Sequence, residues 1–251
     1  MKKTILLCLL GALLTSRADT ITLTVSAAVS LKAPLETLKA EFEKTNPGLG
    51  ILYNFGSSGS LQQQIVHGAP ADVFISAAAK QMDDLERAGL VLSGSRFVLL
   101  ANTIVLIAPA GSTGPGGFDG LTAESVKTIA IGEPKSVPVG MYAMEIFAHL
   151  GLEAGVKNKL VFAKDARQVL FYLESGNADA GIVYGSDAIG SKSVRIVATA
   201  PVGSHNKVEY PAAVIEASGN PGEATAFLDF LRSPWAEALF KSAGFDTKSS
   251  P

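Results

Sequence analysis

Four short runs of small or turn-forming residues each separate a predicted strand from a predicted helix. The clearest is the Gly-Ser-Ser-Gly-Ser run at 56–60, which follows an apolar strand pattern at 50–55 and precedes Leu61 and Ile65 at helical spacing. Strands that alternate with helices in this way predict an α/β fold with mostly parallel sheets. Ligands of such sheets lie at the carboxyl ends of the strands, so these four junctions are candidate binding positions.

The other three junctions carry Ser30, Val139 and Ala166. The first N–H groups of a helix have no partner inside the helix, and the helix dipole makes this end positive. A single junction of this kind is usually a plain turn, and Ser30 and Ser58 can be read as simple helix caps. Because two junctions lie in the first hundred residues and two in the middle hundred, we predict two α/β lobes with one anion site between them.

Residues 1–18 have the pattern of a secretory signal peptide. Lys2 and Lys3 precede a short apolar run, and small residues at Ser16 and Ala18 suit cleavage before residue 19. The only cysteine, Cys8, lies inside the apolar run, where it is poorly placed for lipoprotein processing. We therefore expect a soluble exported protein whose mature chain has no disulfide, as fits a bacterial periplasm.

Charge and hydropathy exclude several other classes of protein. The whole chain has a net charge of −2, and the leader removes three basic residues and no acidic ones, so the mature chain is more acidic and has no basic run. This argues against a nucleic-acid partner. No later segment reaches membrane-spanning length. The three histidines, His67, His149 and His205, lack metal-ligand spacing, so we predict no direct cation ligand and no cofactor.

A serine hydrolase is the competing hypothesis. The run 56–60 resembles the Gly-x-Ser-x-Gly turn of a catalytic nucleophile, but Ser60 stands where the pattern requires its last glycine. His205 follows Asp187 in the order of acid and base that such enzymes use. These two features are its only support, and we predict a protein that is not an enzyme.

Several longer motifs together resemble one family. They are Ser-Ala-Ala-Val-Ser-Leu at 26–31, Gly-Ser-Ser-Gly-Ser-Leu at 56–61, Gly-Ala-Pro-Ala-Asp-Val-Phe-Ile-Ser-Ala at 68–77, Val-Pro-Val-Gly-Met-Tyr-Ala at 137–143, Gly-Ile-Val-Tyr-Gly-Ser-Asp-Ala at 181–188, Lys-Val-Glu-Tyr-Pro at 207–211 and Gly-Phe at 244–245. Across nearly its whole mature length, the chain resembles the periplasmic molybdate-binding proteins that supply ABC importers.

The resemblance implies a two-lobed periplasmic binding protein of type II, with a mostly parallel sheet flanked by helices in each lobe. The first lobe would comprise residues 19–102 and 209–251, and the second 103–208. We also expect one long apolar strand at 102–108, with the hinge near 101–108 and 208–217.

The resemblance further implies which residues bind the ligand. Ser30 and Ser58 would donate hydroxyl hydrogen bonds from the first lobe. The second lobe would contribute backbone N–H groups at Val139 and Ala166 and the hydroxyl of Tyr184. The family often has alanine in place of Val139 and valine in place of Ala166, which leaves backbone donation unchanged but can alter the shape of the cavity.

The expected ligand is molybdate or tungstate, a dianion with acceptor oxygens only, which neutral donors can hold through charge-assisted hydrogen bonds. Sulfate has the same charge and shape, so only cavity size separates it, and another oxyanion such as sulfate stays an alternative. The expected partner is the membrane permease of an ABC transporter, and the expected state is a periplasmic monomer.

Overall fold

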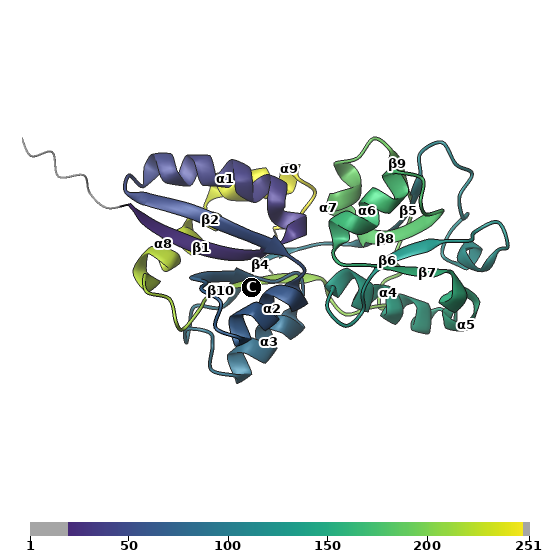
Figure 1. The fold of residues 1–251 in the computed structure, drawn as a ribbon. Helices are drawn as coiled ribbons and strands as arrows, with labels where there is room; N and C mark the ends of the chain where they lie inside the picture. Colours follow the sequence, from purple (N-terminus) through teal and green to yellow (C-terminus); the bar gives the residue numbers. More distant parts are fainter. Residues whose placement is uncertain (1–19, 248–251) are drawn as a thin grey trace, which may run out of the picture.

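The computed structural model describes residues 20–247, so the signal peptide predicted at 1–18 lies outside the described residues. Two five-stranded sheets lie side by side along the long axis of the molecule (Figure 1). The first has the order β2(Leu49–Gly56), β1(Ile21–Ala28), β3(Val73–Ile75), β10(Glu209–Val214), β4(Phe97–Ala101). The second has the order β7(Leu160–Ala163), β6(Ile129–Gly132), β8(Ala180–Tyr184), β5(Ile104–Pro109), β9(Val194–Thr199). We call the unit around the first sheet the first lobe and the unit around the second the second lobe.

Both sheets are mixed in the same way. In the first lobe, β1 pairs in parallel with β2 and β3, while β10 pairs antiparallel with β3 and β4. In the second lobe, β6 pairs in parallel with β7 and β8, while β5 pairs antiparallel with β8 and β9. Four strands of each sheet therefore run in one direction, and the carboxyl ends of β1, β2, β6 and β7 lead into the predicted junctions.

Helices cover both faces of each sheet, which confirms the predicted α/β class. The helices of the first lobe are α1(Lys32–Thr45), α2(Ser58–Val66), α3(Ala79–Arg87), α8(Pro221–Leu231) and α9(Pro234–Ser242). Those of the second are α4(Pro138–His149), α5(Glu153–Val156), α6(Ala166–Glu174) and α7(Gly185–Ile189). Side chains of successive strand residues point to opposite faces. Accordingly, Leu106 packs in one core cluster, while Val105 and Ile107 pack in another with Val169 of α6.

Within residues 20–247, the chain crosses between the sheets twice. Only Asn102 and Thr103 separate β4 from β5, and residues 200–208 connect β9 to β10. The strand predicted at 102–108 therefore starts too early. Asn102 and Thr103 belong to the crossing between the sheets, and β5 begins at Ile104. The second hinge range, 208–217, is also displaced, because β10 is a buried strand paired on both sides and the crossing segment precedes it. The division into lobes at residues 102 and 208 stays a proposal.

Within residues 20–247, the helices are too short or too polar to cross a lipid bilayer.

Candidate functional site

A small cavity lies where the turns of the two lobes meet. Its walls come from the ends of β1, β2 and β3 in the first lobe, and from the starts of α4, α6 and α7 in the second. The residues around it are Ala28, Val29, Ser30, Gly56, Ser57, Ser58, Ala77, Val137, Pro138, Ala166 and Tyr184. Four of the five residues predicted to bind the ligand are thus brought together, from segments up to 154 residues apart in the sequence.

The two adjacent serines of the junction at 56–60 have different roles. Ser57 is the N-cap of α2: its Oγ accepts from the N–H of Ser60 at 3.3 Å and donates to the Ser60 hydroxyl at 2.8 Å. Ser58 is buried, and its Oγ accepts a hydrogen bond from the N–H of Ala77 at 2.9 Å. The hydroxyl hydrogen of Ser58 is then left for an acceptor in the cavity.

Ser30 is oriented by residues that are remote in the sequence. Its Oγ lies 3.1 Å from the hydroxyl of Tyr210, which in turn lies 3.4 Å from Nδ2 of Asn102. An amide nitrogen only donates, so the Tyr210 oxygen accepts from Asn102 and the Tyr210 hydrogen is available for Ser30. Ser30 can then direct its own hydrogen into the cavity. Sequence reasoning did not identify Tyr210 or Asn102, although Tyr210 lies in the Lys-Val-Glu-Tyr-Pro motif.

Tyr184 ends β8 and is the N-cap residue of α7. Its hydroxyl oxygen is fully buried and has no hydrogen-bond partner within the described part of the chain. Burial raises the pKa of this phenol well above its ordinary value, and the nearby Tyr210, Tyr142 and Asp187 add to the rise. Tyr184 is therefore a neutral donor, and an unpaired buried hydroxyl of this kind costs about 1–3 kcal/mol.

The two predicted backbone donors are placed differently from each other. Ala166 is the first residue of α6 and lies on the cavity wall. Val139 is fully buried and is not on the wall, which is formed instead by Val137 and Pro138. Because proline has no N–H, the N–H of Val139 is the first that α4 has. The Val139 side chain thus packs in the core while its backbone lies at the start of the helix.

Gly140 explains how α4 can start so close to the sheet. A Cβ atom at this position would lie 1.9 Å from the carbonyl oxygen of Gly132, the last residue of β6. Only glycine allows this approach, which holds the first turn of α4 against the end of the strand.

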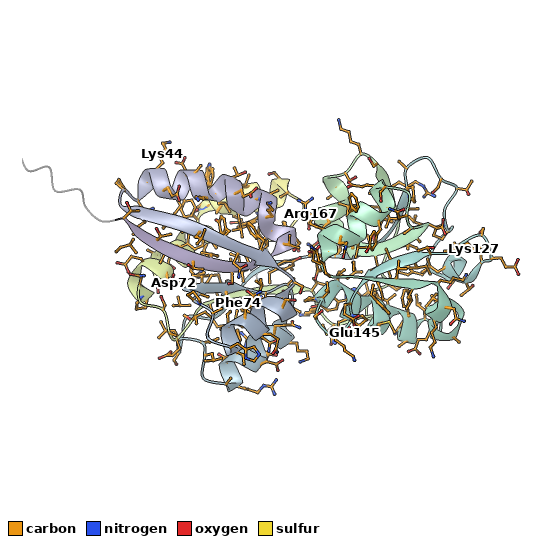
Figure 2. The ribbon with its side chains drawn as sticks, viewed as in Figure 1. Lys44, Asp72, Phe74, Lys127, Glu145 and Arg167 are labelled. Carbon is orange, nitrogen blue, oxygen red and sulfur yellow. The ribbon has the colours of Figure 1, made fainter. Side chains whose placement is uncertain are left out.

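The residues of the cavity wall carry no ionisable acid or base other than the phenol of Tyr184. Within residues 20–247, no cluster of three or more His, Cys, Asp or Glu side chains is arranged to hold a metal ion. Asp187, in the first turn of α7, has one buried carboxylate oxygen without a partner. Burial raises the pKa of this carboxyl to about 7, and Arg167, which lies where the lobes meet (Figure 2), opposes the rise.

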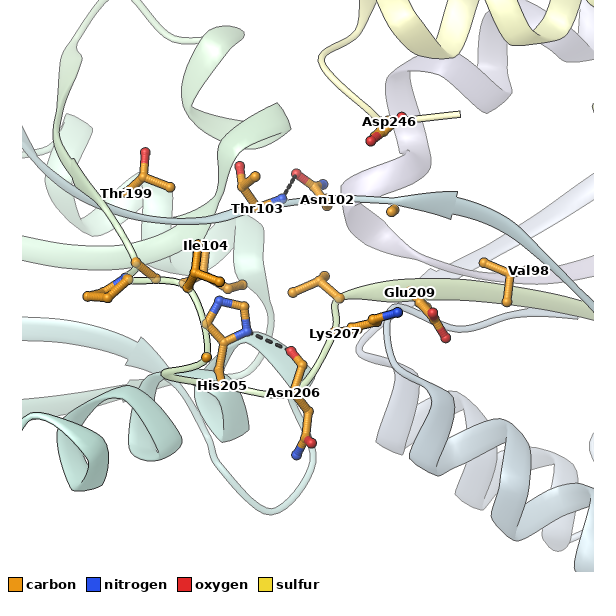
Figure 3. Close-up of a pocket in the computed structure, with 16 residues that line it drawn as sticks. Val98, Asn102, Thr103, Ile104, Thr199, His205, Asn206, Lys207, Glu209 and Asp246 are labelled. Carbon is orange, nitrogen blue, oxygen red and sulfur yellow. Dashed lines mark hydrogen bonds between the residues drawn. The ribbon is translucent and has the colours of Figure 1, made fainter. Parts of the chain in front are cut away.

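The residues of the hydrolase hypothesis are not assembled around Ser58. His205 lines a separate cavity together with Asn102 and Lys207, on the segments where the chain crosses between lobes (Figure 3). Its Nδ1 lies 2.6 Å from the carbonyl oxygen of Asn206, and its ring packs against Tyr142. The cavity that contains Ser58 therefore has no histidine to act as its base.

Known proteins show the same architecture and sequence pattern. Residues 23–246 match the model of the family described as bacterial extracellular solute-binding protein. The molybdate-binding protein ModA of Escherichia coli is 40% identical over 236 residues, which cover 92% of this chain and 91% of that protein. The structure of the periplasmic molybdate-binding protein of Azotobacter vinelandii is 29% identical with a TM-score of 0.80, covering 89% of this chain and 98% of that one.

The fold is shared more widely than the sequence. The sulfate-binding protein SubI of Mycobacterium tuberculosis H37Rv superimposes with a TM-score of 0.76 at 19% identity, covering 91% of this chain and 88% of that one. This likeness concerns the fold alone. With the family match over residues 23–246 and the identity to ModA, the chain belongs to the bacterial extracellular solute-binding protein family.

Proposed function

We propose that this protein captures molybdate or tungstate between its two lobes and delivers the ion to the membrane permease of an ABC transporter. The observation that carries the proposal is the buried Tyr184 hydroxyl without a partner, which lines the same cavity as Ser30 and Ser58. The oxygen of each serine already has a neighbour that can donate to it, so each serine has a hydrogen left to donate. A cavity of donors without a matching acceptor suits a ligand that only accepts.

Molybdate is such a ligand, because all four of its oxygens are acceptors and it is a dianion at neutral pH. In this proposal Ser30, Ser58 and Tyr184 donate their hydroxyls, and Val139 and Ala166 donate backbone N–H groups at helix starts. Hydrogen phosphate carries a proton that would meet no acceptor here, at a cost of about 1–3 kcal/mol. The names of the Escherichia coli and Azotobacter vinelandii relatives agree with molybdate.

The proposal also covers the state, the location and the motion of the protein. The protein acts as a monomeric, non-catalytic carrier in the periplasm, it needs no cofactor, and nucleic acid is not a partner. The lobes separate to admit the ion and close around it about the crossings at 102–103 and 200–208.

Sulfate is the alternative ligand, because it matches molybdate in charge and shape and a sulfate-binding protein shares the fold. The bonds in sulfate are shorter, so the spacing of the donors across the cavity decides between the two ions. A serine hydrolase is disfavoured by the absence of a histidine from the wall of the Ser58 cavity.

A thermal-shift titration with molybdate, tungstate, sulfate and phosphate tests the proposal. A ligand that binds only the folded protein stabilises it by about 2.7 kcal/mol at a concentration of 100 times Kd. We expect molybdate and tungstate to raise the melting temperature, and phosphate to leave it unchanged. An equal shift with sulfate would contradict the selectivity, and no shift with any of the four ions would contradict oxyanion binding. Labelling of Ser58 by a fluorophosphonate probe would instead support the hydrolase.

A further inference from the structure

One backbone hydrogen bond joins the two lobes beside the cavity. The N–H of Gly59 in α2 of the first lobe donates to the carbonyl oxygen of Ser136, just before α4 of the second lobe, at 3.0 Å. The starts of α2 and α4 face each other across the boundary between the lobes (Figure 1). This bond satisfies an N–H of the first turn of α2 with the opposite lobe and not with a ligand.

The approach of the two backbones is possible only because residue 59 is glycine. A Cβ atom at this position would lie 2.5 Å from the carbonyl oxygen of Ser136, 2.8 Å from its Cα and 3.0 Å from its carbonyl carbon. All three are backbone atoms, so no side-chain rotation would relieve the overlap. By contrast, a Cβ at Gly56 in the same turn would meet only side-chain atoms of Leu61, at 3.3 Å or more.

The contact is adjacent in sequence to the cavity on both sides. Ser58, which precedes Gly59, and Val137, which follows Ser136, both line the cavity. The separation of Gly59 from Ser136 therefore sets how close the Ser58 hydroxyl comes to the start of α4. Two backbones in hydrogen-bond contact cannot approach further without overlap, whatever ion lies between the lobes.

We propose that the contact between Gly59 and Ser136 is the stop that limits lobe closure, and that Gly59 is a specificity-determining position of the oxyanion site. This inference rests on the proposed function. Molybdate, whose bonds to oxygen are longer than those of sulfate, reaches the donors of both lobes when Gly59 and Ser136 are in contact. Sulfate, with shorter bonds, cannot draw the lobes closer and loses hydrogen bonds to one of them.

Gly59→Ala tests the stop, and Gly222→Ala is its matched control. Both glycines are the second residue of a helix, but a Cβ at Gly222 in α8 has no atom within 4 Å. Molybdate and sulfate affinities of the wild type and both variants are measured by isothermal titration calorimetry. We expect Gly59→Ala to weaken molybdate binding by about tenfold or more, through loss of the closed geometry and its hydrogen bond, and Gly222→Ala to leave it unchanged.

Sulfate should bind Gly59→Ala no better than it binds the wild type, because the alanine holds the lobes further apart. If Gly59→Ala binds molybdate as tightly as the wild type, or binds sulfate more tightly, the contact does not limit lobe closure. The proposed function would be unaffected by either result. Both variants should keep the circular dichroism spectrum of the wild type, because Gly59→Ala can relieve the overlap by separating the lobes while each lobe stays folded. Loss of the folded spectrum in Gly59→Ala means that the contact is needed for folding, and this also overturns the inference. A wild type that binds neither ion refutes the proposed function, and the inference with it.

Discussion

Replacing Tyr184 by phenylalanine should stabilise the ligand-free protein and weaken ion binding at the same time. The substitution removes one hydroxyl oxygen that is buried without a partner. Leaving such a group unpaired costs about 1–3 kcal/mol, and removing it returns part of this cost, since a small void remains. A gain of about 1 kcal/mol corresponds to a rise of about 2–4 °C in the melting temperature for a protein of this size.

The effect on affinity has the opposite sign. In the proposed complex, the Tyr184 hydroxyl makes one charge-assisted hydrogen bond to the oxyanion. Such a bond contributes about 1.5–3 kcal/mol, so its loss should weaken molybdate binding roughly 10- to 150-fold. A residue with a purely structural role would not combine higher stability with lower affinity.

Scanning calorimetry of the ligand-free protein and titration calorimetry with molybdate measure the two effects separately. Tyr142→Phe is the control: this ring is also buried, but its hydroxyl donates to the carbonyl oxygen of Lys207 at 3.3 Å and is not on the cavity wall. We expect Tyr142→Phe to lower stability by about 1 kcal/mol and to leave affinity unchanged. If Tyr184→Phe behaves like Tyr142→Phe, the assignment of Tyr184 as a ligand donor is wrong.

Four other substitutions test the surroundings of the site. Tyr210→Phe removes the hydroxyl that orients Ser30, and titration calorimetry should show roughly tenfold weaker molybdate binding, whereas unchanged affinity would refute the orienting role. Ser58→Ala should weaken binding by a similar factor, while Ser57→Ala should cost about 1 kcal/mol of stability as a lost helix cap and leave affinity intact; equal effects would contradict this division. Asp187 has a folded-state pKa of about 7, above its unfolded value, so its contribution to stability is highest at low pH and falls as pH rises towards 7. Urea unfolding should therefore show Asp187→Asn equal to the wild type near pH 4 and about 2–4 kcal/mol more stable at pH 8, and a difference independent of pH would refute the buried carboxyl.

Local patterns in the sequence were sufficient to predict the turns of the site. Strand periodicity, capping serines and helical spacing act over fewer than about ten residues, so the junctions at Ser30, Ser58 and Ala166 could be found without knowledge of the fold. The same local information placed the start of the strand predicted at 102–108 two residues too early, since β5 begins at Ile104. An apolar run shows that a segment is buried, but it does not show in which sheet, and here two adjacent runs enter different sheets.

The sequence by itself thus determined the fold class and the turns that line the cavity, while export by the leader stays a prediction. Only the tertiary structure decided which hydroxyls are free to donate. Ser58 accepts from Ala77, Ser30 lies against Tyr210, and Gly59 reaches Ser136 across the lobes. These contacts join residues 19 to 180 positions apart. They depend on the order of the strands in each sheet and on the distance between the lobes. No local pattern of residues encodes the strand order or this distance.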